Sequence, residues 1–330
     1  MKYINKYYEI AVKLFHARLI KVIFSLSFIL VSFLANKAMS QSLTQMNSNY
    51  FEVLGSKMHV FSAGEKEKGS PILFLHGNPS SSYLWRNIAP QLKGTGHPIY
   101  IPDLIGMGKS EKPAIDYTYL EQYAYLEALI KELKLENIIL VLHDWGSGLG
   151  FNYFANHPEN VRAIAFMEGI IQDIGTYFDE DTKNFFRQLR GENGYKMIAE
   201  ENIFLNDVLP TWVVRELTKE ELEAYRAPFP TVESRKPIWK FVSQVPFDGK
   251  PELTSAIVKN YREKLQLSRI PKLFFYAEPG AFMPEPVRKW VIENLPNLEV
   301  VNIGKGTHFI QEDNPELIKS KLIEWVKKLN

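Results

Sequence analysis

The sequence predicts an α/β fold in which a mostly parallel, doubly wound sheet carries a helical cap domain. Short apolar runs alternate with helical segments from residue 72 to residue 168, which is typical of parallel strands joined by crossover helices. The alternation stops at about residue 170, and the chain is then mostly helical and rich in aromatic residues and proline. We therefore expect a core formed by residues 45–169 and 249–330, with a helical cap at 170–248. At 330 residues with 45% hydrophobic content, the chain is long enough for both.

The first 40 residues have the features of a targeting segment and are left out of the predicted fold. Residues 22–35 are apolar, basic residues precede them, and Ala38-Met39-Ser40 provides a small-residue cleavage site for a signal peptide. The apolar stretch is short for a membrane span, but the long basic region before it leaves an uncleaved anchor open. We expect export to the periplasm or outside the cell, with any membrane contact confined to residues 1–40.

Charge and composition exclude several kinds of partner and site. Residues 1–40 hold six of the 39 Lys and Arg residues but only one of the 38 acidic residues, so the remainder carries a net charge of −4. A chain with that charge is not expected to bind nucleic acid. It has no cysteine, which excludes disulfides, thiolate zinc sites and a cysteine nucleophile.

The predicted elements begin with two antiparallel edge strands. Segments 49–54 and 57–61 are rich in strand-forming residues and flank Gly55. Buried strands are then expected at 72–75, 98–101, 138–142, 161–167, 271–278 and 298–303. Helices are expected at 80–92, 117–133, 148–155, 287–294 and 315–328.

The stretch around Asp144 is where a functional site is expected first. Five apolar residues at 138–142 lead into His143 and Asp144, and glycines follow at once. Asp144 is thus expected at the carboxyl end of a central strand, where doubly wound sheets bind ligands, and at a helix amino terminus, which favours a negative charge. The turn resembles the nucleophile elbow of α/β-hydrolases with Asp in place of Ser, although Leu142 stands where that elbow has glycine. An aspartate that only caps the helix is the alternative.

Other strand ends supply an acid and a base. Either Glu168 or Glu278 provides the acid, and His308 follows the last predicted strand. The order nucleophile, acid, histidine is that of α/β-hydrolases. The run Gly106-Met107-Gly108-Lys109-Ser110 resembles the end of a nucleotide-binding P-loop, but Asp103 replaces the first glycine of that motif, so nucleotide binding is not expected.

Several motifs over residues 45–330 together resemble the haloalkane dehalogenases, which include the coelenterazine-type luciferases as a close branch. They are His76-Gly77-Asn78-Pro79-Ser80-Ser81-Ser82-Tyr83-Leu84-Trp85, Asp103-Leu104-Ile105-Gly106-Met107-Gly108-Lys109-Ser110, His143-Asp144-Trp145-Gly146, Met167-Glu168, Ala277-Glu278-Pro279-Gly280 and His308-Phe309-Ile310-Gln311-Glu312-Asp313-Asn314-Pro315. The resemblance implies an α/β-hydrolase fold and hydrolysis of haloalkanes. The targeting segment departs from the familiar cytoplasmic members.

The resemblance also implies the role of each site residue. Asp144 would be the nucleophile, His308 the base and Glu168 the acid that orients it. Asn78 and Trp145 would hold the leaving halide. Glu278 remains the rival acid, because it ends the strand that carries the acid in another subgroup of the family.

The chemistry fits these residue types. A carboxylate can displace halide from an sp3 carbon to give an alkyl ester, and an indole N–H with a carboxamide can stabilise the departing anion. A histidine can then activate the water that hydrolyses the ester. The expected partners are a small apolar halogenated substrate, water and halide, and no metal or organic cofactor is required.

Four other functions remain open. A luciferase-like monooxygenase would share nearly every motif, and an epoxide hydrolase would use the same Asp–His pair with cap tyrosines. The tyrosines available for that role are Tyr177, Tyr195 and Tyr225. A non-enzymatic binding protein would not need the catalytic set, and a serine esterase would have to use Ser147, three residues past the elbow.

Overall fold

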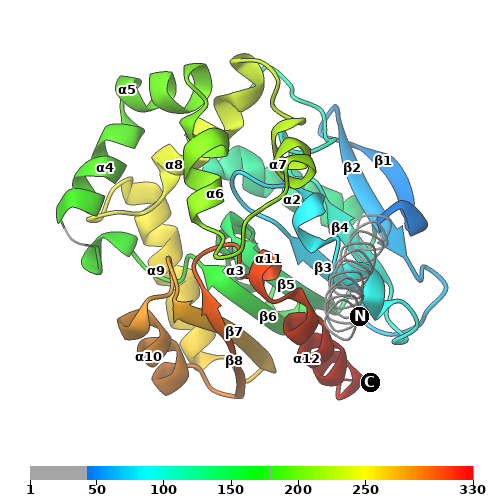
Figure 1. The fold of residues 1–330 in the computed structure, drawn as a ribbon. Helices are drawn as coiled ribbons and strands as arrows, with labels where there is room; N and C mark the ends of the chain where they lie inside the picture. Colours follow the sequence, from blue (N-terminus) through cyan, green and yellow to red (C-terminus); the bar gives the residue numbers. More distant parts are fainter. Residues whose placement is uncertain (1–42, 179, 330) are drawn as a thin grey trace, which may run out of the picture. The chain divides into compact units, whose positions relative to one another are not determined.

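One eight-stranded sheet organises the chain in the computed structural model, which describes residues 43–178 and 180–329 (Figure 1). Its strand order is β1-β2-β4-β3-β5-β6-β7-β8. The strands are β1 (Asn47–Val53), β2 (Ser56–Ala63), β3 (Ile72–Leu75), β4 (Ile99–Pro102), β5 (Ile138–Asp144), β6 (Val161–Gly169), β7 (Lys272–Pro279) and β8 (Leu298–Gly306). Strands β3 to β8 are parallel to one another, whereas the pairs β1–β2 and β2–β4 are antiparallel. The predicted sheet is confirmed, except that β2 lies inside it and only β1 is an edge strand of the pair.

Burial on both faces explains why the central strands are continuous apolar runs. Every residue of β3 and of β5 is buried. Helix α3 (Trp145–Asn156) packs on β5, β6 and α9 (Glu252–Leu267), and α12 (Pro315–Lys327) packs on β8. In Figure 1, α12 lies in front of the sheet and α3 behind it. The doubly wound arrangement therefore places β5 at the centre of the core.

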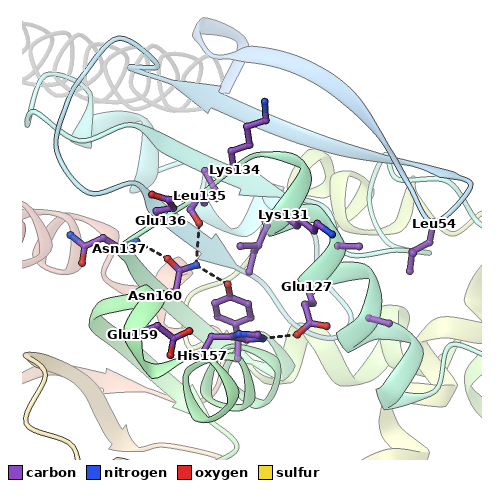
Figure 2. A pocket seen from close by; sticks show the side chains of 14 residues that line it. Leu54, Glu127, Lys131, Lys134, Leu135, Glu136, Asn137, His157, Glu159 and Asn160 are labelled. Atoms are coloured by element: carbon purple, nitrogen blue, oxygen red, sulfur yellow. Dashed lines mark hydrogen bonds and ion pairs between the residues drawn. The ribbon is translucent and has the colours of Figure 1, made fainter.

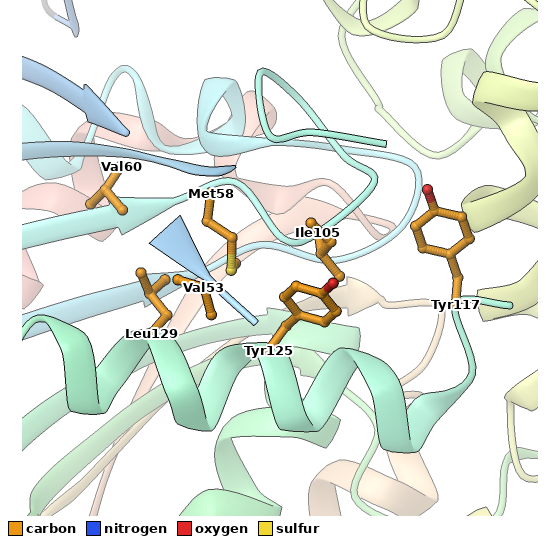
Figure 3. Close-up of a cluster of buried hydrophobic side chains, with 7 residues drawn as sticks. All are labelled: Val53, Met58, Val60, Ile105, Tyr117, Tyr125 and Leu129. Carbon is orange, nitrogen blue, oxygen red and sulfur yellow. The ribbon is translucent and has the colours of Figure 1, made fainter. Parts of the chain in front are cut away.

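The antiparallel hairpin is held to α2 (Tyr119–Glu132) by a buried apolar cluster (Figure 3). Helix α2 begins at a capping box, in which Thr118 and Glu121 exchange side-chain to backbone hydrogen bonds. The cluster joins hairpin residues to α2 and to the loop between β4 and α2. Its members are Val53, Met58, Val60, Ile105, Tyr117, Tyr125 and Leu129.

Two helix predictions were wrong or missing. Residues 80–92 form two separate 3-10 turns, η2 (Ser82–Trp85) and η3 (Ala89–Leu92), because the N–H of Ser82 is bonded to the Asp103 carboxylate and Pro90 begins a new turn. Helix α9 was not predicted, although its buried residues are spaced as in an amphipathic helix. These residues are Thr254, Val258, Tyr261 and Leu265. Helix α10 (Glu285–Asn294) was predicted.

Short helices fill the segment between β6 and α9, as predicted for 170–248, and lie together at one end of the sheet (Figure 1). They are η5 (Ile174–Thr176), α4 (Glu180–Arg190), α5 (Glu192–Tyr195), η6 (Lys196–Glu200), η7 (Phe204–Val208), α6 (Leu209–Thr211), α7 (Lys219–Arg226), η8 (Glu233–Arg235) and α8 (Lys236–Gln244). Residues 46–330 form one compact unit. The exact limits of core and cap therefore stay a prediction.

The predicted targeting segment, residues 1–40, lies outside the described residues. Within residues 43–178 and 180–329, no helix has the length and apolar character needed to cross a bilayer.

Candidate active site

Asp144 stands at a strained turn between β5 and α3. Its φ of 49° and ψ of −127° are unusual for a residue with a side chain, and such strain is found where a fold fixes a functional group. The tight turn explains Gly146, because a Cβ there would lie 2.3 Å from the carbonyl oxygen of Leu75. Leu142, which replaces the usual elbow glycine, fits because Gly150 leaves room for it: a Cβ at Gly150 would come within 2.5 Å of the Leu142 side chain.

The Asp144 carboxylate is buried and its two oxygens have different neighbours. Oδ1 accepts the backbone N–H of Asn78 at 2.6 Å. The preceding Gly77 permits this approach, since a Cβ there would lie 2.0 Å from Oδ1. Oδ2 lies 3.5 Å from Nε2 of His308. Burial favours the neutral acid, but His308 and the Asn78 N–H lower the pKa of Asp144 below its usual value, so the carboxylate is ionised.

His308 lies beyond β8 in the loop leading to α11 (Ile310–Asp313), and its imidazole lies between two carboxylates. Its Nδ1 is 3.5 Å from Oε2 of Glu168 and, like Nε2, is fully buried. Burial alone would lower the pKa of His308, but Asp144 and Glu168 raise it to about 9. His308 is therefore an imidazolium at neutral pH while both carboxylates are charged.

The structure brings Glu168, and not Glu278, to His308. Glu168 is fully buried near the end of β6, where its Oε2 accepts the backbone N–H groups of Ala281 at 2.9 Å and Phe282 at 2.8 Å. Glu278 is exposed at the end of β7, and its carboxylate is 3.5 Å from the amide of Asn302.

Asn78 and Trp145 each carry a buried side-chain donor, Asn78 being bonded to Asp144 through its backbone and Trp145 following Asp144 in the chain. The indole Nε1–H of Trp145 is buried and has no hydrogen-bond partner within the described residues. Asn78 donates one amide proton to the Ile238 carbonyl at 3.2 Å, which leaves its other amide proton available. The Trp145 ring packs against Tyr119 and Phe241, with centroids 5.7 Å and 5.4 Å away. A buried, unpaired N–H in aromatic surroundings suits a weakly hydrated anion.

Other contacts with the base were not predicted. His143 Nε2 donates to the His308 carbonyl at 2.9 Å, and burial lowers the pKa of His143 to about 3, so it is neutral. In the cap, the carbonyl of Trp212 accepts the N–H groups of His308 at 3.2 Å and Phe309 at 3.0 Å. The rings of Trp212 and Phe282 flank the imidazole at 4.8 Å and 4.6 Å. Of these residues, only His143 could have been singled out from the sequence, because it lies next to Asp144 in the motif at the end of the strand.

Ser147 has a structural role at the elbow. Its hydroxyl donates to the carbonyl of Asp144 and accepts the N–H of Ile170. The first bond closes the turn at the start of α3, and the second ties this turn to the segment after β6. A hydroxyl occupied in this way does not favour a serine esterase.

A surface hollow of about 1070 Å³ lies away from this site (Figure 2). Its lining includes Asn137, which precedes β5, and Asn160, which precedes β6, so it lies at the opposite ends of these strands. Several of its polar groups pair with one another, as Glu127 does with His157 at 2.6 Å and Asn160 with Tyr153 at 2.8 Å. Among the described residues, no group of three or more His, Asp or Glu side chains could hold a metal ion.

Known proteins similar to this chain share one activity in their names. A family model described as alpha/beta hydrolase fold matches residues 70–315, which confirms the predicted fold. The chain is 37% identical over 282 residues to a haloalkane dehalogenase of Mesorhizobium japonicum, covering 84% of this chain and 90% of the relative. It is 40% identical over 289 residues to one from Sphingobium indicum, covering 85% and 95% respectively.

Solved structures give the same result. The haloalkane dehalogenase DatA from Agrobacterium tumefaciens superposes with a TM-score of 0.82 at 35% identity, covering 88% of this chain and 99% of DatA. DbeA from Bradyrhizobium elkani, another haloalkane dehalogenase, gives a TM-score of 0.82 at 37% identity, covering 86% and 98%.

The two carboxylates make a testable prediction about the charge of His308. Removing either charge should lower the pKa of His308 below about 9, because each carboxylate stabilises the imidazolium. We expect Asp144→Asn and Glu168→Gln to shift it downward, measured by NMR of ¹⁵N-labelled histidine and assigned with His308→Phe. Glu278→Gln is the matched control and should leave the titration unchanged. An unshifted titration in Asp144→Asn would contradict the assigned ion pair.

Proposed function

The chain belongs to the haloalkane dehalogenase family, and on that premise we propose that it hydrolyses haloalkanes to an alcohol, a halide ion and a proton through an alkyl ester on Asp144. One arrangement carries the proposal: the ionised Asp144 carboxylate lies 3.5 Å from His308, which in turn lies 3.5 Å from Glu168, and Trp145, the next residue in the chain, has a buried indole N–H without a partner among the described residues. These few residues thus supply a nucleophile, a base for water and a donor for a departing anion.

In the first step, Oδ2 of Asp144 attacks the carbon that bears the halogen. Oδ1 stays bonded to the Asn78 N–H and becomes the carbonyl oxygen of the ester. The carbon–halogen electron pair leaves with the halide, which the Trp145 indole and the free amide proton of Asn78 receive. His308 takes no part in this step, since its protonated imidazole cannot act as a base.

Ester formation then prepares the second step. It removes the negative charge of Asp144, so only Glu168 remains to stabilise the imidazolium and the pKa of His308 falls. The imidazolium releases its proton to solvent, which is the proton of the overall reaction, and the neutral imidazole then takes a proton from water as the hydroxide attacks the ester carbonyl. The second proton of that water leaves with the alkoxide as the alcohol, which restores the Asp144 carboxylate and the imidazolium. The Asn78 N–H, already directed at Oδ1, stabilises the oxyanion until the alcohol leaves.

The cap tyrosine that an epoxide hydrolase would need is not available at Tyr225. Its hydroxyl donates to the Glu312 carboxylate at 2.5 Å, and burial raises its pKa well above the usual value. This bond takes Tyr225 out of the candidates for a proton donor to an epoxide oxygen.

Halide release from matched chlorinated, brominated and iodinated alkanes tests the proposal. We expect one halide and one alcohol per turnover, with iodo- and bromoalkanes faster than chloroalkanes, because the better leaving groups lower the barrier of the first step. Epoxide hydrolysis and luminescence with a coelenterazine-type substrate are measured in parallel. Turnover of either substrate without halide release from any haloalkane would overturn the proposal.

Asn78→Ala tests the halide donors. The halide carries its full negative charge only after it has left the carbon, and only then does the Asn78 amide interact with that charge. Removing the amide should therefore lower the rate constant of the first step more than it weakens substrate binding. A lost donor of this kind typically costs about 10²–10³ in rate. Stopped-flow halide release gives the rate constant, and an unchanged value would remove Asn78 from the site.

We also propose that the protein is exported. Residues 1–40 are then either a signal peptide that is cleaved off or an uncleaved segment that anchors the protein in the membrane. The basic, apolar and small-residue order of that segment supports the proposal, as does a chain without cysteine, which suits an oxidising compartment. Expression of the full chain in a Gram-negative bacterium, with fractionation and N-terminal sequencing, provides the test. Cleavage gives a soluble periplasmic protein that begins at Gln41, and an anchor gives the full chain in membranes. A full-length protein in the cytoplasm would contradict both.

A further inference from the structure

The loop that carries His308 is bonded to one segment of the cap. His308 and Phe309 donate their backbone N–H groups to the carbonyl of Trp212. Beyond them, Oδ1 of Asp313 accepts the backbone N–H groups of Val214 at 2.8 Å and Arg215 at 3.1 Å. Residues 308–313 comprise the loop that carries His308, which we call the base loop, and α11. Together with cap segment 212–215 they form a continuous joint, which we call the base–cap joint.

A buried ionic network lies behind the base–cap joint, with Glu312 at its centre. Arg86 donates to both Glu312 oxygens, at 2.5 Å and 2.8 Å, and Arg215 donates to Oε2 at 2.6 Å. Glu221 in α7 accepts from the same two arginines. The side chains of Glu312 and Arg86 are 1% and 4% exposed, so this central pair is removed from water, whereas Glu221 and Arg215 are 20% and 33% exposed at its outer side.

The cost of burying these charges indicates what the network does. Desolvation of Arg86 and Glu312 offsets most of their attraction, and the partly exposed Arg215 and Glu221 are screened by water, so such a network adds little net stability. It does require one arrangement of its parts, because any displacement leaves a buried charge unpaired. Arg215 connects the network to the joint, since its Nε also donates to the carbonyl of Glu312 at 2.7 Å.

The imidazole of His308 needs such external support. Its nitrogens lie 3.5 Å from both carboxylates, a loose distance for a hydrogen bond. The remaining contacts of the ring are aromatic, with Trp212, Phe282, His143 and Phe309. The backbone bonds to Trp212, together with the bond from His143 to the His308 carbonyl, therefore fix where the imidazole lies.

We propose that Glu312 and Arg215 are positioning residues for His308: they hold the cap segment on the base loop and thereby place the imidazole for the water-activating step. This inference rests on the proposed function, in which His308 acts only in ester hydrolysis. Loosening the joint should slow that second step and spare alkylation of Asp144. Displacement of a catalytic group by about 1 Å can cost on the order of 10²-fold in rate.

Arg215→Met provides the main test, with Arg187→Met as the matched control. Arg187 is also a cap arginine with two carboxylate partners, Glu180 and Asp248, but it lies in α4 away from the base loop. Rapid-quench kinetics with a bromoalkane would follow the halide burst for alkylation and the decay of alkyl-enzyme mass for hydrolysis. We expect Arg215→Met to slow hydrolysis about tenfold or more and to accumulate alkyl-enzyme, with alkylation within about twofold of wild type.

Arg215→Lys should restore part of the hydrolysis rate, because it returns the charge without the planar donor pair. Arg187→Met should leave both steps near wild type. Thermal unfolding shows whether Arg215→Met is folded. If it is not, Tyr225→Phe, which removes only one hydrogen bond to Glu312, replaces it in the test, and slower hydrolysis with unchanged alkylation is again the expected result.

Equal slowing of both steps, or no slowing in a folded variant, would overturn the positioning role. A wild-type enzyme that forms no alkyl-enzyme would instead overturn the proposed function, and the positioning role with it.

Discussion

The buried negative charge of Asp144 is the constraint on which the rest of the site depends. A carboxylate at this depth stays ionised because the groups around it, the Asn78 N–H and His308 among them, offset the loss of water. The same charge, with Glu168, keeps His308 protonated. The resting site is therefore an ion-pair cluster, and the base becomes available only when the nucleophile loses its charge. Alkylation removes that charge, so the electrostatics themselves order the two steps.

The fold supplies this arrangement through strand ends. Strands β5 and β6 are parallel neighbours, and β8 lies further along the same sheet, so Asp144, Glu168 and His308 meet at one edge. The positive φ of both Asp144 and Glu168 turns these carboxylates out of their strands. The cap then closes on the base by way of Trp212. The sheet thus supplies the reacting side chains, the cap supplies the segment that packs on them, and the two parts contact each other at His308.

The chemical residues were predictable from sequence because each follows a buried apolar run, and such runs mark strand ends. The choice of Glu168 over Glu278 came from the family resemblance and not from the strand pattern, since both residues end a strand and only the packing of loop 280–282 buries one of them. The room that Gly150 leaves for Leu142 also depends on tertiary packing. So do the contacts of Trp212 and the network around Glu312, because no periodicity places a cap segment on a particular loop. The break at 80–92 arises from a bond to Asp103, far along the chain.

Trapping the covalent intermediate tests the central claim most directly. His308→Phe removes the base but leaves Asp144, the halide donors and the apolar surroundings in place. With a bromoalkane, this variant should release about one halide per enzyme and stop, and the alkyl mass should appear by intact-protein mass spectrometry and map to Asp144. Steady halide release by His308→Phe, the absence of any adduct, or an adduct on Ser147 or Glu168 would contradict covalent catalysis by Asp144.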